Sequence, residues 1–75
     1  MKKEELAARL SELREKLEAF PYTKSRLMKQ YNAELSYGSV SGAESVRVKI
    51  QDLEGEAEAL RLEVKSLEAL DQEQS

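Results

Sequence analysis

The chain of 75 residues contains no cysteine and no histidine. Their absence excludes disulfides, thiolate metal sites and the commonest general base of enzymes. Tryptophan is also absent, and aromatic residues make up only 5% of the chain, a composition that suits solvated helices better than a thick globular core. The sequence therefore predicts no catalytic residue, no metal site, no cofactor and no enzyme activity.

Long apolar runs are missing as well. No stretch approaches the roughly 20 apolar residues that span a bilayer. The first residues, Met1–Lys3, are followed at once by Glu4 and Glu5 instead of the apolar run of a signal peptide. We therefore expect a cytoplasmic protein without a membrane partner.

Glycine and proline are rare, and their positions divide the chain in two. Two of the three glycines lie in the segment 37–42, between two long stretches of helix-forming residues. The pattern predicts one domain, with helices over about 3–36 and about 42–70, a turn at 37–42 and a frayed polar tail at 71–75. Ser41 and Glu44 have the spacing of a capping box, which predicts where the second helix starts.

Apolar residues in both stretches recur at alternating steps of four and three. This spacing keeps them on one side of a slightly underwound helix and favours pairing with another helix. The predicted fold is all-α, an antiparallel coiled-coil helical hairpin that dimerises into a four-helix bundle. An opened, swapped dimer is the alternative, because the same stripes serve both arrangements. The predicted hairpin core consists of Leu6, Leu10, Leu13, Leu17, Phe20, Leu27, Tyr31, Val46, Ile50, Leu53, Ala57, Leu60, Val64 and Leu67.

The single proline falls inside the first predicted helix. Pro21 removes the hydrogen bond to the carbonyl of Leu17 and crowds that turn, at a cost of about 3 kcal/mol. The heptad phase nevertheless continues through Phe20 to Lys24. We therefore predict a kinked, continuous helix, with a true break at the proline as the alternative. A β-hairpin over residues 25–37 is a further alternative that the helical spacing disfavours.

The net charge of −3 conceals an asymmetry between the two halves. Residues 1–37 hold eight Lys and Arg against six Asp and Glu, whereas residues 38–75 hold four against nine. Folding the second half back onto the first places opposite signs side by side, although each exposed pair contributes only roughly 0.2–0.5 kcal/mol. The acidity of the whole chain disfavours nucleic acid as a partner.

A second apolar column lies on the far side of the second predicted helix. A hairpin buries one stripe per helix and leaves such a column exposed. Two interpretations remain open: single exposed apolar residues, which are normal on a surface, or an interface for a dimer or another protein. This outer column consists of Val48, Gly55, Ala59, Leu62 and Ala69.

All four aromatic residues fall within residues 20–37, among basic residues. This mixture can bind nucleic acid, but the acidity of the chain and the place of Phe20 and Tyr31 in the apolar stripe argue against it. Tyr and Arg are also enriched at binding hot spots. The candidate contacts for a protein partner, with ordinary surface residues as the alternative, are Tyr22, Arg26, Lys29 and Tyr37.

These observations favour a small non-enzymatic interaction module, either an adaptor or an inhibitor. It would act through coiled-coil helix faces and through self-association, with itself or another protein as the partner. The alternative is a structural or chaperone subunit of a larger assembly, such as a secretion apparatus or a phage head–tail junction. A nucleic-acid-linked regulator is a third, disfavoured hypothesis.

Overall fold

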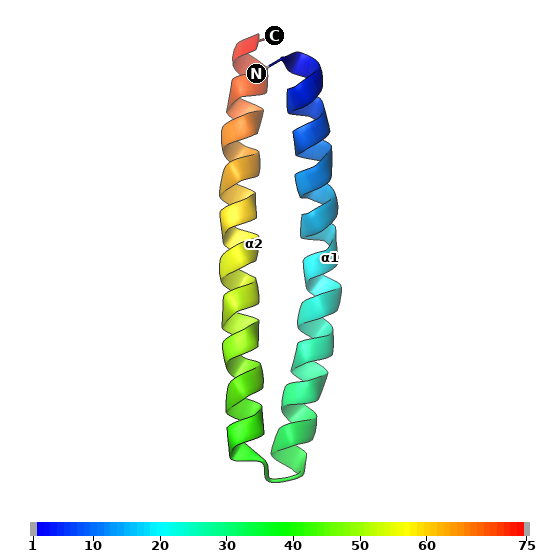
Figure 1. The fold of residues 1–75 in the computed structure, drawn as a ribbon, viewed down its shortest axis with the longest axis vertical. Coiled ribbons are helices and arrows are strands. Elements are labelled where there is room, and N and C mark those ends of the chain that lie inside the picture. The colour runs from blue at the N-terminus through cyan, green and yellow to red at the C-terminus, as the bar shows by residue number, and fades with distance from the viewer. Residues whose placement is uncertain (1, 75) are drawn as a thin grey trace.

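The computed structural model describes residues 2–74 as two long helices folded into an antiparallel hairpin (Figure 1). Helix α1 spans Lys3–Ser36 and helix α2 spans Val40–Gln74. The hairpin measures 56 × 15 × 13 Å, as expected for helices of 34 and 35 residues that rise about 1.5 Å per residue. Both ends of the chain lie at one end of the hairpin, called here the open end. The prediction of an all-α helical hairpin is confirmed.

The turn is shorter than the predicted segment 37–42, because Gly38 reverses the chain in a single step. Its φ of +75° is the left-handed conformation that glycine adopts at little cost. Gly38 N–H donates to the carbonyl of Leu35 at 3.0 Å, and Ser39 N–H donates to the carbonyl of Glu34 at 2.8 Å. These two bonds form a Schellman motif, which satisfies the last carbonyls of α1.

The predicted capping box at Ser41 and Glu44 is wrong. The N–H of Ala43 donates to the carbonyl of Ser39 at 3.0 Å, so Ser39 holds the N-cap position and α2 begins before Ser41. Glu44 accepts a hydrogen bond from Nε of Arg47 at 3.1 Å instead of capping the helix. Since Gly38 completes the reversal, the serine that follows it directly is the first residue able to start the new helix.

The end of α2 also differs from the prediction. The helix continues through residues 71–74, where a frayed tail was expected. Gln and Glu are good helix formers, and no glycine or proline ends the helix there. Residue 75 of that predicted tail lies outside the described residues.

Helix α1 continues through Pro21 without interruption, so the alternative of a broken helix is wrong. The β-hairpin considered over residues 25–37 is likewise wrong, because residues 25–36 are helical. In Figure 1 the axis of α1 changes direction slightly in the cyan part of the helix. The phase of the apolar stripe was therefore the correct guide to the course of the chain.

The tightest packing lies at the open end of the hairpin. Leu6 and Leu13 are completely enclosed, and Leu10 lies between them with 6% of its surface exposed. These three leucines pack with Val64 and Leu67 of α2 into one buried cluster. This cluster joins the first turns of α1 to the last turns of α2.

Packing is looser toward the middle of the hairpin. Leu13 is the last buried residue of α1, and Leu17, Phe20, Leu53 and Leu60 are only half-buried. Near the turn, the buried residues all come from α2. They are Ala43, which the heptad pattern did not identify, together with Val46 and Ile50, whereas Ala57 is buried in the middle of the hairpin, at the level of Pro21. Each of the fourteen residues predicted for the hairpin core is buried or half-buried.

Candidate functional site

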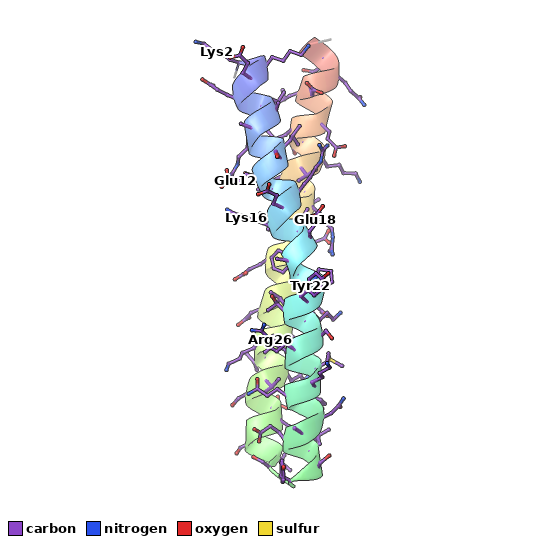
Figure 2. The ribbon with its side chains drawn as sticks, turned by 90° about the vertical axis from the view of Figure 1, so that its right-hand side faces the viewer. Lys2, Glu12, Lys16, Glu18, Tyr22 and Arg26 are labelled. Carbon is purple, nitrogen blue, oxygen red and sulfur yellow. The ribbon has the colours of Figure 1, made fainter. Side chains whose placement is uncertain are left out.

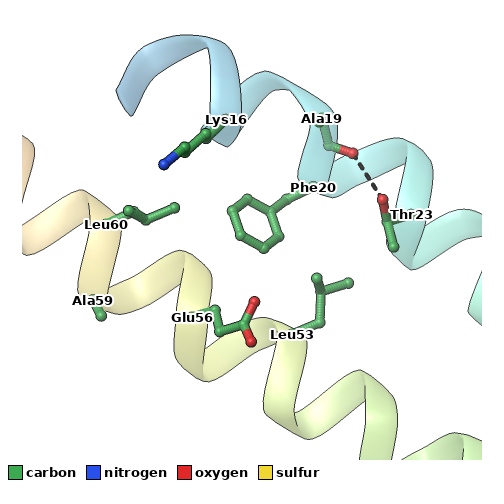
Figure 3. A pocket seen from close by; sticks show the side chains of 8 residues that line it. All are labelled: Lys16, Ala19, Phe20, Thr23, Leu53, Glu56, Ala59 and Leu60. Atoms are coloured by element: carbon green, nitrogen blue, oxygen red, sulfur yellow. Dashed lines mark hydrogen bonds between the residues drawn. The ribbon is translucent and has the colours of Figure 1, made fainter. Parts of the chain in front are cut away.

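A hollow of about 530 Å³ opens on one side of the hairpin, midway along its length (Figure 3). The ring of Phe20 points from α1 toward α2 and forms its centre, with Leu53 and Leu60 on the facing helix. We call it the Phe20 hollow. It is lined by Lys16, Ala19, Phe20, Thr23, Leu53, Glu56, Ala59 and Leu60.

Small residues explain why the ring remains partly uncovered. Ala19 and Thr23 lie one turn apart on α1, and the hydroxyl of Thr23 donates to the carbonyl of Ala19 at 3.3 Å, which holds that side chain against its own helix. Ala59 provides only a methyl group on the facing side. Small side chains around one large ring leave an apolar notch that a further helix could fill.

A second hollow of about 450 Å³ lies on the opposite side of the hairpin at the same level. It shares Phe20 and Leu53 with the first hollow, but its rim is more highly charged. It is lined by Phe20, Pro21, Lys24, Leu53, Glu54, Ala57, Glu58 and Arg61. The two hollows together show that α2 alone does not cover α1 at the level of Pro21.

Lys24 is the one charged residue in the apolar stripe of α1. Its ammonium nitrogen lies 2.8 Å from Oε1 of Glu54 on α2. Both side chains are about half exposed, so the pair remains in contact with water while the stem of Lys24 covers apolar surface. This pairing explains how a lysine occupies a core position without an unpaired buried charge.

Two further ion pairs link the helices near the open end. Nη2 of Arg9 lies 3.1 Å from both carboxylate oxygens of Glu63, and this hydrogen bond raises the pKa of Arg9. Arg14 reaches Glu68 at 3.3 Å. In each of the three ion pairs that join the helices within residues 2–74, the cation belongs to α1 and the carboxylate to α2, as the charge asymmetry of the two halves predicts.

Two carboxylates on the hairpin surface have a lowered pKa. Hydrogen bonds from Lys16 and Arg9 lower the pKa of Glu12, and a hydrogen bond from Arg47 lowers that of Glu44. In both cases the cause is an adjacent cation on the same helix and not burial. Such shifts are typical of helix-surface ion pairs and do not identify an acid or base for catalysis.

The outer column predicted from the sequence lies on the exposed face of α2. Val48 and Leu62 expose 45% and 57% of their surface. A Cβ added to Gly55 would have no atom within 4 Å, so this part of the helix is open to solvent. Ala59 differs from the rest of the column because it lines the Phe20 hollow.

The structure brings three of the four candidate partner contacts together. Tyr22, Arg26 and Lys29 share one exposed face of α1, and Figure 2 shows Tyr22 and Arg26 on the helix that faces the viewer. Tyr22 exposes 81% of its surface. Tyr37 lies apart at the turn, where it is 88% exposed.

The heptad pattern did not indicate the Phe20 hollow as a surface. It assigned Phe20 and Leu60 to the core but gave no role to Ala19, Thr23 or Glu56, which surround them. The available signal was the small size of Ala19 and Thr23 on either side of the one phenylalanine in the sequence. A pattern of apolar positions does not reveal it, because the notch depends on side-chain size.

Among residues 2–74, no group of His, Cys, Asp or Glu is arranged to hold a metal ion. In the same residues neither helix has the length and apolarity needed to cross a bilayer. Compared with models of protein families, with curated proteins and with solved structures, the chain matches none.

Proposed function

We propose that this chain is a small protein–protein interaction module that acts as an adaptor or inhibitor through its helix faces and also associates with itself. The observation that carries the proposal is the incomplete burial of the apolar stripe. Beyond Leu13 no side chain of α1 is buried, and the hollows on both sides of Phe20 leave apolar surface uncovered. Uncovered apolar surface next to a charged rim is typical of a surface that binds another protein.

The exposed apolar residues outside the hairpin core support the same proposal. Leu62 on the outer face of α2 and Tyr22 on α1 are well exposed. Tyrosine supplies large contact area at low entropic cost, and a leucine on a helix face can anchor a partner helix. If two partners bound two such faces at once, the chain would bridge them as an adaptor. If one face covered the binding surface of a single partner, the chain would act as an inhibitor.

Site-specific photo-crosslinking in cells that express the chain tests this function. A photoreactive phenylalanine analogue is placed at Tyr22, at Thr23 beside the hollow or at Leu62, with Lys65 as an exposed control on α2. We expect a discrete cross-linked species at one or more of the first three positions and none at Lys65. Mass spectrometry then identifies the captured chain. Equal, diffuse labelling at all four positions would contradict an interaction module.

The alternative of a subunit in a larger assembly is distinguished by the same experiment. A ladder of regularly spaced cross-linked masses containing this chain indicates a ring or filament. One or two masses indicate a discrete complex and favour the adaptor or inhibitor.

A further inference from the structure

We infer that the Phe20 hollow is the docking surface for a second copy of this chain, with α1 of each copy lying along α2 of the other. The inference rests on the proposed self-association and specifies its surface and symmetry. Two hairpins stacked in this way form a four-helix bundle in which neighbouring helices are antiparallel. The two-fold axis runs parallel to the long axis of the hairpin.

Apolar contact would stabilise the dimer because the second copy covers the half-buried residues in the middle of the hairpin. Phe20, Leu53 and Leu60 are half-buried, and they converge at the floor of the hollow. Ala19 and Ala59 lie on opposite rims and offer no long side chain that would hold a second hairpin away. With the proposed symmetry, Ala19 of one copy meets Ala59 of the other, so the backbones approach most closely where the core is thinnest.

Charge complementarity selects a second copy as the occupant. On the side of the hollow, α1 presents the cations Arg9 and Lys16 and, between them, the carboxylate of Glu12 that pairs with both. On the same side α2 presents Glu56 and Glu63 at the corresponding levels. Glu56 has no cationic partner among residues 2–74. When α1 of one copy lies along α2 of the other, Lys16 lies beside the partner copy's Glu56. Lys49 lies seven residues before Glu56 on α2, nearer the turn, and gains no carboxylate in this arrangement.

The other two-fold arrangement brings like charges together. If the second hairpin ran in the opposite direction, α1 would lie on α1 and α2 on α2. Glu56 would then approach its own counterpart, and the cations of the two α1 helices would share one surface. Like charges that face each other across an interface are unfavourable, so the surface is self-complementary in one orientation only.

The rims of the two hollows differ in the charges that α2 places on them. On the rim of the second hollow α2 carries both signs, with Glu54 and Arg61, whereas on the rim of the Phe20 hollow its one charged residue is Glu56. The outer column also lacks a charge pattern of one sign on each helix, because it belongs to α2 alone. Among these surfaces the Phe20 hollow therefore combines the largest apolar notch with complementary rims.

The first test measures molar mass by light scattering on a size-exclusion column, over about a hundredfold range of concentration. We expect the unaltered chain to dissociate from dimer to monomer, or to remain a dimer, within that range. Ala59→Arg places a long charged side chain in the hollow and should raise the dissociation constant at least about tenfold. The matched control Ala69→Arg makes the same change on the outer column of the same helix and should leave the dissociation constant within about twofold.

Charge reversal supplies a second pair of variants that does not alter the apolar floor. Lys16→Glu and Glu56→Lys should each weaken the dimer, and the double variant should recover most of the loss, because the two residues meet across the proposed interface. Far-UV circular dichroism on every variant verifies that the hairpin is intact, since both positions are exposed.

Disulfide trapping tests the symmetry, because the native chain has no cysteine to interfere. An equimolar mixture of Ala19→Cys and Ala59→Cys chains should yield the mixed disulfide in preference to either homodimer. A preference for the two homodimers would assign the opposite orientation and overturn the inference.

Three other outcomes would also overturn it: a monomer at every concentration, equal effects of Ala59→Arg and Ala69→Arg, or a double charge variant no better than the single ones. A monomer that still captures a different protein by photo-crosslinking would refute self-docking while leaving the proposed interaction function intact. A monomer that captures nothing would refute both.

Discussion

The open end of the hairpin and its middle contrast in packing, although the same heptad pattern runs through both. At the open end, Leu6 and Leu13 are completely enclosed by α2. In the middle, Leu17 and Leu60 occupy equivalent positions and are only half-buried. Identical spacing therefore produces unequal burial. What differs is the side chains beside the stripe, which are long and paired at the open end and small around Phe20.

The largest expected effect comes from the same truncation made in the two regions. Leu13→Ala removes a fully enclosed side chain and should lower the free energy of unfolding by about 3 kcal/mol. Leu60→Ala removes a half-buried side chain and should cost about 1–2 kcal/mol, since Leu60 removes less apolar surface from water on folding than Leu13 does. Chemical denaturation followed by circular dichroism measures both. Equal costs at the two positions would show that the middle is as tightly packed as the open end.

Pro21→Ala tests whether the proline causes the loose packing in the middle. Alanine restores the hydrogen bond to the carbonyl of Leu17 and removes the ring clash, so the free energy of unfolding should rise by about 2–3 kcal/mol. The same denaturation experiment measures the gain. No gain would mean that packing around Pro21 already compensates for the lost hydrogen bond. The difference in packing between the open end and the middle would then be due to side-chain size alone.

A smaller gain is expected from Gly55→Ala on the facing helix. An added Cβ meets no atom within 4 Å, so alanine should stabilise the helix by about 0.5–1 kcal/mol through its better helix propensity. Gly42→Ala is the matched control, because its Cβ would press on the side chains of Glu34 and Ser39 and the gain should be smaller or absent. Melting temperatures of both variants compare the two gains in stability. An equal gain would show that the side chain of Glu34 moves away from the added Cβ at little cost.

The smallest effect is the dependence of stability on pH. Because Glu12 and Glu44 have a lowered pKa in the folded chain, each favours folding above its ordinary pKa. This contribution to stability is lost as the pH falls through the lowered pKa that each carboxyl group has in the folded chain. Melting temperatures between neutral and strongly acidic pH should therefore decline, and Glu12→Gln should flatten part of the decline. A profile that is unchanged in the variant would mean that this ion pair does not persist in solution.

The sequence predicted the hairpin and its core because periodicity records which face of a helix is buried. It also predicted continuity through Pro21, since the phase of the stripe would have shifted across a loop. It misplaced the start of α2 because Ser39 and Ser41 are both chemically suited to begin a helix. The choice between them depends on the left-handed conformation of Gly38, which is a three-dimensional feature. The Phe20 hollow was missed for a similar reason, since it depends on how much of a ring small neighbours leave uncovered.

The left-handed glycine at the turn has a consequence for what the chain could become if it opened. If Gly38 were helical and the chain a single rod, the apolar stripe that ends at Tyr31 would not continue into Val46 and Ile50. Counted in sevens from Tyr31, the stripe would reach residues 45 and 52, so Val46 and Ile50 would lie roughly 100° and 150° around the rod from it. A straightened chain would carry its two apolar stripes on different sides, so a single partner helix could not cover both of them. The conformation of one residue, with φ of +75°, thus brings the two stripes together within one chain.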